Sequence, residues 1–279
     1  MIDAHTHIQF AAYEKDRDEV IARAKAAGVR MVTVGTQKDA SRFGIELAKK
    51  YEGWIYATVG LHPIHTSKSF HDAQELGGEN GFTSRGEEFD PAYYLELAKD
   101  PHVVAIGECG LDYFRIEGDI AQAKEKQKDA FLKHIAIAEA VKKPLMLHCR
   151  PSAGTDDAYE DILEIISNCQ FPISKIVHFY VGSLEMAKKL LDAGFYFTFG
   201  GVITITRDYD GIVRFIPFEK ILSETDAPYV APAPYRGKRN EPAYVIEAVK
   251  KLAELKKESV ETMAETTLQN ARRVFNIGL

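Results

Sequence analysis

Residues 1–36, MIDAHTHIQFAAYEKDRDEVIARAKAAGVRMVTVGT, contain one complete unit of the fold. Residues 1–7 include two histidines but are otherwise suited to a β-strand, and residues 31–36 are a β-branched, apolar run suited to a second strand. Between them, residues 16–28 repeat apolar side chains at helical spacing and end on Gly28, a residue suited to the end of a helix. A strand, a helix and a second strand predict a parallel strand pair joined by a right-handed crossover.

The same alternation continues through the chain. Further helices are expected at 39–51, 120–143 and 183–194, and further strands at 54–62, 103–108, 144–149, 175–179, 195–201 and 221–226. Eight strands alternating with helices in 279 residues are typical of an α/β fold of the TIM type, a closed (β/α)8 barrel. The sequence has no glycine-rich nucleotide-binding motif of an open sheet and no linker, so residues 1–279 are expected to form one barrel domain.

Composition narrows the class of protein. Hydrophobic residues make up 46% of the chain, which is enough for a large core, and the net charge of -6 excludes a broad basic surface that coats nucleic acid. The three cysteines are odd in number and lack C-x-x-C spacing, so no disulfide framework is expected. Without a signal peptide or a membrane-spanning run, the sequence predicts a cytoplasmic protein that does not bind membranes. Nothing in it points to a particular oligomer.

Several of the expected strands end on residues that can bind metal or take part in catalysis. Barrel enzymes hold their active sites at the carboxyl ends of the strands. His5 and His7 alternate along the first strand and therefore share a face, although an H-x-H pair alone is also a common surface accident. Five other strands also end on histidine or an acid, and together these residues predict a metal site: His62, Glu108, His148, His178 and Asp226.

This set is large enough for two divalent metal ions, such as magnesium, manganese or zinc. We expect Glu108 to bridge them, with the first-strand histidines and Asp226 on one ion and His148 and His178 on the other. A water or hydroxide between the ions would be the nucleophile. Glu108 and Asp226 are the expected catalytic carboxylates, with Asp226 as the base that accepts a proton from the attacking water.

The chain also resembles the TatD-type metal-dependent hydrolases, a family of deoxyribonucleases on a barrel related to the amidohydrolases. The resemblance runs over nearly the whole chain. It rests on D-A-H-T-H at 3–7, G-L-H-P at 60–63, G-E-C-G-L-D-Y at 107–113, L-H-C-R at 147–150, V-H-F-Y-V-G-S at 177–183, F-G-G-V-I-T at 199–204 and E-T-D-A-P-Y at 224–229, continuing into R-G-K-R-N-E-P at 236–242. It implies the same metal ligands, and it implies that His62 and Arg150 lie near the substrate phosphate.

Three segments depart from the family pattern. After His178 the family usually has Cys-Phe-Ser-Gly-Ser, whereas this chain has Phe-Tyr-Val-Gly-Ser at 179–183, which changes the wall beside one metal. Residues 151–156 are inserted after Arg150 and are expected to rim the substrate cleft. The longer polar stretch 66–90 has no clear period and is expected to be either a solvated loop or a lid.

The substrate class follows less directly from the residues. Cationic side chains fall just beyond strand ends, and we expect them to bind phosphate: Arg115, Arg150, Arg236, Lys238 and Arg239. The segment 236–239 is equally consistent with a solvated charged turn. The favoured function is hydrolysis of phosphodiesters in single-stranded DNA by a 3′–5′ exonuclease. The alternatives are an amidohydrolase-like enzyme for a lactone or amide, and an inactive barrel that acts as a binding protein.

Several residues near the motifs are expected to have no part in the site. Cys109 and Cys149 adjoin ligand candidates on their strands, so they should point outward into helix packing. Trp54 at the start of a strand is expected to pack. The remaining histidines lie in loops or helices and are not expected to bind metal: His65, His71, His102 and His134.

Overall fold

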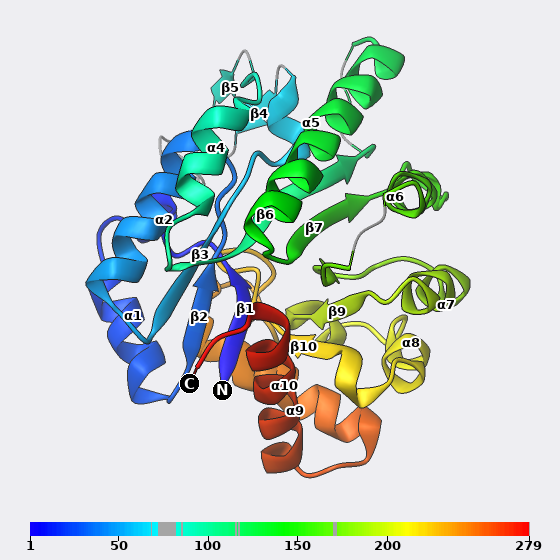
Figure 1. Ribbon diagram of the computed structural model, residues 1–279. Coiled ribbons are helices and arrows are strands. Elements are labelled where there is room, and N and C mark those ends of the chain that lie inside the picture. The colour runs from blue at the N-terminus through cyan, green and yellow to red at the C-terminus, as the bar shows by residue number, and fades with distance from the viewer. Residues whose placement is uncertain are drawn as a thin grey trace.

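The computed structural model describes residues 1–67, 69–71, 82–84, 86–114, 116, 118–169 and 172–278. Within these ranges, eight parallel strands form one sheet that curves into a nearly closed barrel, so the predicted TIM-type (β/α)8 fold is confirmed (Figure 1). In pairing order the strands are β1 (Ile2–Thr6), β2 (Arg30–Thr33), β3 (Ile55–Val59), β6 (Val103–Asp112), β7 (Leu145–Arg150), β8 (Lys175–Val177), β9 (Tyr196–Phe199) and β10 (Ile221–Ser223).

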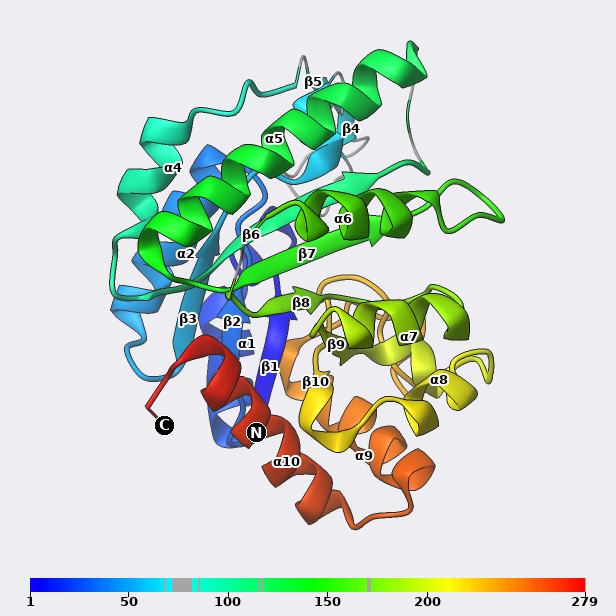
Figure 2. The same cartoon turned by 45° about the vertical axis from the view of Figure 1, so that its right-hand side comes forward.

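Helices surround the sheet on its outer side in both views (Figures 1 and 2). Side-chain oxygens of Asp90, Asp119, Ser183 and Ser259 accept backbone N–H bonds at four helix starts, as short polar caps do. The helices are α1 (Arg17–Ala26), α2 (Lys38–Lys50), α4 (Pro91–Ala98), α5 (Ile120–Val141), α6 (Asp157–Ser167), α7 (Leu184–Asp192), α8 (Asp210–Phe215), α9 (Val245–Lys256) and α10 (Val260–Phe275). Short 3-10 turns include η2 (Pro63–Thr66) and η5 (Pro242–Tyr244). None of the helices described combines the length and apolar character needed to cross a membrane.

The barrel closes between its first and last strands. Thr6 and Ala227 form a parallel bridge, and the His7 amide donates to the Ala227 carbonyl at 2.8 Å. The Asp226 amide donates to the His5 carbonyl at 2.9 Å. These bonds lie at the carboxyl ends of both strands, so the closure itself places two histidines beside an aspartate from a distant part of the sequence.

Alternation along the strands separates the barrel interior from the helix layer. In β7, Met146 belongs to an apolar cluster with Ile2, Val32 and Leu222, whereas Leu145, Leu147 and Cys149 pack with the helices. His148 has the same parity as Met146 and therefore faces the barrel axis. Residues of α10 also join the interior cluster, namely Ala271, Val274 and Phe275. Apolar side chains thus fill one end of the barrel interior, and polar and charged side chains lie at the other end.

The observed strand bounds correct several of the predicted ones. The strand expected at 103–108 continues to Asp112, so Glu108 lies inside β6 rather than at its end. By contrast, β3, β8, β9 and β10 stop earlier than expected, which leaves His62, His178 and Asp226 in the loops that follow their strands. The sequence therefore predicts correctly which residues lie near the carboxyl end of the barrel. The exact end of each strand depends on the hydrogen-bonded register.

The polar stretch 66–90 is not without regular structure. Its described part contains an antiparallel hairpin of β4 (Ser69–His71) and β5 (Phe82–Ser84). The hairpin lies at the end of the barrel away from the labelled chain ends (Figures 1 and 2). Phe89 is buried and stacks on Tyr94 of α4, which fastens the return of the stretch to the barrel. Residues 68, 72–81 and 85 lie outside the described residues, so the choice between loop and lid stays a prediction.

Candidate metal centre

Most of the predicted site residues meet at the carboxyl end of the barrel. They surround a pocket of about 580 Å³. His5 is fully buried beneath the pocket, and the predicted residues that line it are His7, His62, Glu108, His148, Arg150, His178 and Asp226. The residues predicted from the strand ends therefore lie together in the structure. They come from β1, β6 and β7 and from the loops after β3, β8 and β10.

The first group of donor atoms lies between β1, β6 and β10. The Nε2 atoms of His5 and His7 are 3.2 Å apart, and Oε2 of Glu108 lies 3.5 Å from the first and 3.7 Å from the second. Oδ1 of Asp226 lies 3.7 Å from His5 Nε2 and 3.5 Å from His7 Nε2. Two ligands about 2.1 Å from a tetrahedral ion are roughly 3.4 Å apart, so this spacing fits a divalent cation.

The second group faces the other oxygen of Glu108. Its Oε1 lies 2.8 Å from His178 Nε2, 3.1 Å from His148 Nδ1 and 3.3 Å from His62 Nε2. His148 Nδ1 and His178 Nε2 are themselves 3.3 Å apart. Glu108 therefore presents one carboxylate oxygen to each group, which is the geometry expected of a bridging ligand between two ions.

The hydrogen bond at the outer ring nitrogen distinguishes His62 from the histidines that are expected to bind metal. His7 Nδ1 donates to the Val34 carbonyl at 2.9 Å, and His148 Nε2 lies 2.9 Å from Asp112 Oδ2, so the inner nitrogen of each ring is the one left for a metal. His62 is arranged in the opposite way. The Ile64 amide donates to His62 Nδ1 at 3.2 Å, which places the ring proton on Nε2 and makes the inner nitrogen a donor.

Interactions with nearby histidines keep the carboxylates of Glu108 and Asp226 ionised. Burial raises the pKa of Glu108, but the surrounding histidines, chiefly His62 and His178, hold this pKa well below its usual range. The pKa of Asp226 is lowered in the same way by His7, His5 and His178 against the effect of burial. Burial also works against the charge of His148, yet Asp112 and Glu108 raise its pKa to about 9. An anionic centre rimmed by imidazoles is a suitable environment for cations.

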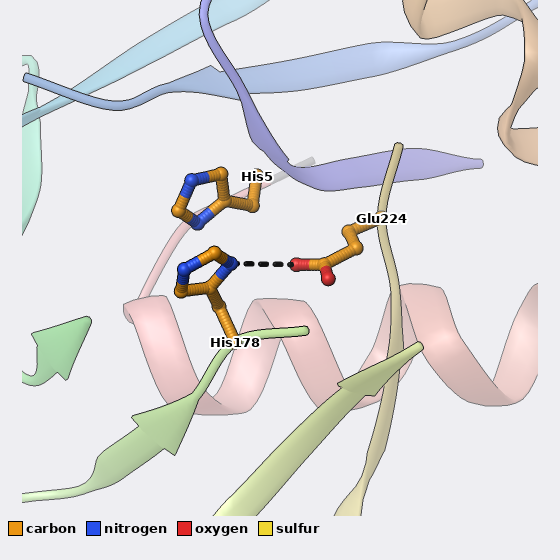
Figure 3. A group of neighbouring side chains, drawn as sticks. All are labelled: His5, His178 and Glu224. Carbon is orange, nitrogen blue, oxygen red and sulfur yellow. Dashed lines mark ion pairs between the residues drawn. The ribbon is translucent and has the colours of Figure 1, made fainter. Parts of the chain in front are cut away.

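A buried carboxylate, Glu224, stands behind the second group. Figure 3 shows the His5 and His178 rings side by side, with ring centroids 3.9 Å apart, and Glu224 directed at His178. Glu224 Oε2 is 3.8 Å from His178 Nδ1, while its Oε1 accepts from the Phe179 amide at 2.8 Å. In the described part of the chain, His5 Nδ1, His178 Nδ1 and Glu224 Oε2 have no hydrogen-bond partner. Burial and the nearby Asp226 raise the pKa of Glu224 well above its usual range.

Sequence reasoning missed Asp112 and Glu224. Both stand in quoted motifs, G-E-C-G-L-D-Y and E-T-D-A-P-Y, but neither ends an expected strand. The sequence did contain one signal for them, an acidic residue within an otherwise apolar run. Asp112 and Glu224 are both buried, and a buried acid without a partner costs free energy, so each needs a partner. The partner of Asp112, His148, comes from the neighbouring strand β7, and the partner of Glu224, His178, follows β8, two strands away in the sheet, so both pairs become visible only once the sheet is assembled.

Two glycines on β6 permit the close backbone packing beside Glu108. Gly107 has φ +149° and Gly110 has φ +124°, a region that favours glycine. A Cβ on Gly107 would collide with the Met146 carbonyl oxygen, and one on Gly110 with that of His148. The G-E-C-G segment therefore lets β6 press against β7 at the level of the metal centre.

The arginines have different environments. The Arg150 guanidinium lines the pocket and lies 4.0 Å above the Phe114 ring. Arg236 is exposed and is not among the residues that line the pocket, and Lys238 is exposed beside it. The expectation that Arg239 contacts phosphate is contradicted, because its guanidinium binds Asp16 at 2.6 and 2.8 Å and the Ala12 carbonyl at 2.6 Å. Arg115 lies outside the described residues.

The cysteines and remaining histidines behave largely as packing residues. Cys109 is fully buried among apolar side chains, and Cys149 packs in the same cluster while also reaching the pocket wall. His134 accepts from the Leu61 amide at 2.9 Å and lies outside the donor groups, as does His102 beside Asp100. His65 is buried and lines the pocket without joining a donor group. Trp54 packs at the edge of the core and the side chain of His71 lies outside the description.

Comparison with known proteins agrees with this geometry. The family model described as TatD related DNase matches residues 2–276. The chain is 36% identical over 281 residues to the uncharacterized metal-dependent hydrolase YabD of Bacillus subtilis, covering 99% of each chain. It is 32% identical to the 3′-5′ ssDNA/RNA exonuclease TatD of Salmonella typhimurium, again covering 99% of each. The crystal structure of YJJV, a TatD homologue from Escherichia coli, superimposes with a TM-score of 0.80 at 25% identity, covering 100% of this chain and 98% of the other. The chain therefore belongs to the TatD-related DNase family of metal-dependent hydrolases.

Proposed function

We propose that this protein is a phosphodiesterase that removes nucleotides from the 3′ end of single-stranded DNA or RNA, with two divalent metal ions as cofactors. The observation that carries the proposal is the division of donor atoms by Glu108, whose two oxygens face separate groups at the floor of one pocket. The first ion would be held by His5, His7 and Asp226, and the second by His148 and His178. The printed name of the Salmonella relative supports the substrate class and the direction of cleavage.

The residues of the chain have distinct tasks in this proposal. Divalent ions bound to such a site lower the pKa of water and neutralise charge on phosphate oxygens. His62 presents its Nε2 proton toward the pocket, where it donates a hydrogen bond to a phosphate oxygen. Arg150 supplies the positive charge on the pocket wall that orients the phosphodiester. Asp226 stays ionised and accepts the proton of the attacking water.

The pocket also suits the size of the substrate. Its volume of about 580 Å³ is within the range of roughly 300–1,000 Å³ that is usual for small-molecule sites. A pocket of this size can hold one nucleotide. This agrees with removal of single nucleotides from a free end.

A direct test compares labelled single strands. Purified protein with measured metal content is incubated with 5′-labelled and 3′-labelled oligonucleotides, with and without a chelator. Stepwise shortening of the 5′-labelled strand and immediate release of the 3′ label, both abolished by the chelator, are the expected results. A panel of lactones, amides and neutral esters is assayed at the same metal loading. Turnover of a neutral substrate without any cleavage of DNA or RNA would overturn the proposal and leave the barrel and donor groups in place.

A further inference from the structure

A second depression adjoins the metal pocket. Its volume is about 770 Å³, and it runs between Phe114, the inserted segment 151–156, residues 181–184 and the start of α8. Arg150, Val181 and Tyr209 line both the pocket and this depression. The two spaces therefore adjoin at these residues. A ligand that fills the metal pocket lies next to the depression, here called the side groove.

An exposed aromatic ring lies on one wall of the side groove. Phe114 is 49% exposed, although large apolar side chains usually lose most of their surface on folding. Its position is nevertheless well defined. The Phe114 amide donates to Asp112 Oδ1 at 3.0 Å, and the preceding Tyr113 donates its hydroxyl to Asp161 at 2.7 Å. The backbone of Phe114 is thus held by the same aspartate that faces His148.

The chemistry of the side groove favours a neutral ring over a chain of phosphates. Among the described residues that line it, Arg150 is the one cation. Its guanidinium carbon lies 4.0 Å from the centre of the Phe114 ring, so it covers one face of a ring that is still 49% exposed. The inserted segment contributes Ser152, Thr155 and Asp156, and Asp156 is already engaged by the Ser183 hydroxyl at 2.8 Å. One phosphate can lie at Arg150, where the two spaces meet, but a second phosphate deeper in the groove would face an acid instead of a base.

We propose that Phe114 is a stacking platform for the base of the nucleotide next to the 3′-terminal one. This inference rests on the proposed function. The terminal nucleotide occupies the metal pocket, the scissile phosphate lies near Arg150, and the adjoining base enters the side groove and stacks on the exposed ring. Stacking of this kind contributes affinity without reading sequence, because every base has an apolar face.

The experiment removes the base and the ring separately. Two single-stranded oligonucleotides are compared, identical except that one has an abasic residue next to its 3′-terminal nucleotide. Wild-type protein is expected to cleave the abasic strand with a KM higher on the order of 10-fold and a similar kcat. Phe114→Ala should raise the KM of the intact strand by a similar factor and should no longer distinguish the two strands. Phe114→Tyr should restore the discrimination.

Matched controls make the result decisive. Phe215 is an aromatic residue of α8 that is 40% exposed outside both spaces, so Phe215→Ala should leave the discrimination unchanged. Metal content is measured for each variant. Equal KM values for the two strands with wild-type protein would overturn the inference alone, as would a Phe114→Ala protein that still discriminates. Absence of cleavage of either strand by wild-type protein overturns the proposed function and this inference with it.

Discussion

His62 and His148 approach the same oxygen, Oε1 of Glu108, at 3.3 and 3.1 Å, but their outer nitrogens have opposite partners. A backbone amide donates to the outer nitrogen of His62, whereas an aspartate accepts from that of His148. These contacts support different roles in the proposed site, with His62 as a hydrogen-bond donor and His148 as a metal ligand.

This difference predicts different consequences for the same substitution. His62→Ala should retain both ions and lose about 10²- to 10³-fold in kcat, as expected when a positioned donor is removed. His148→Ala should lose one ion and nearly all activity while staying folded. Metal analysis and steady-state kinetics on the two variants provide the comparison. Loss of an ion from His62→Ala would show that His62 is a ligand instead.

Asp112 should tune metal affinity through His148. The 2.9 Å contact orients the imidazole and makes its inner nitrogen more basic, so Asp112→Asn should weaken binding of one ion by about 10- to 100-fold. Calorimetric titration of the metal-free protein measures this change. Asp129→Asn is a suitable control because that exposed residue contacts only Lys133 on the same helix among the contacts described. Equal affinities for wild type and Asp112→Asn would contradict the assignment.

Glu224 should act on the same ion from the other side. It is the buried carboxylate that faces His178 Nδ1, so Glu224→Gln is expected to lower the affinity of the second donor group and leave that of the first nearly unchanged. Stepwise titration with a spectroscopically visible ion such as cobalt separates the two. Weakening of both ions to the same degree would indicate general damage to the barrel.

Much of this site could be predicted from the sequence because barrel geometry converts strand ends into neighbours. The positions of Glu108, His148 and Asp226 near the carboxyl ends of three predicted strands are sufficient to group them. Asp112 and Glu224 could not be found in this way, since their roles depend on which residues of other strands the assembled sheet places beside them. Arg239 resembled a phosphate ligand in the sequence, but the chain places Asp16 within reach of it.

Arg150 should contribute binding to phosphate without contributing to the metal site. Arg150→Ala is expected to lower kcat/KM for single-stranded DNA by roughly 10- to 100-fold at unchanged metal content. With about two to four phosphate contacts, log affinity against log salt should have a slope of roughly -1.5 to -3, and the variant should be shallower by about 0.7. Arg42→Ala, an exposed site on α2, is the control. An unchanged slope would place the phosphate elsewhere.

His134 should make the free energy of unfolding depend on pH, and this effect should be independent of the metal centre. Burial lowers its pKa from 6.5 to about 4, so the unfolded chain binds this proton more readily than the folded protein does. The corresponding stability is complete above pH 6.5 and is lost as the pH falls toward 4, by up to about 3 kcal/mol. In urea denaturation of metal-free protein, His134→Gln should show a smaller loss across this window. The same loss in His134→Gln as in the wild type would contradict this assignment.

The pairing of Thr6 with Ala227 also sets when the enzyme can become active. One donor group takes His5 from β1, His7 from the residue after it and Asp226 from the loop after β10, so a nascent chain that has not yet emerged as far as Asp226 lacks a complete group. During synthesis, hydrolytic activity therefore arises only after nearly the whole barrel has left the ribosome. Because ions bind the closed arrangement and not the open one, they also favour closure by mass action. If the proposed function holds, the protein cannot cleave the RNA that encodes it until its own folding is finished.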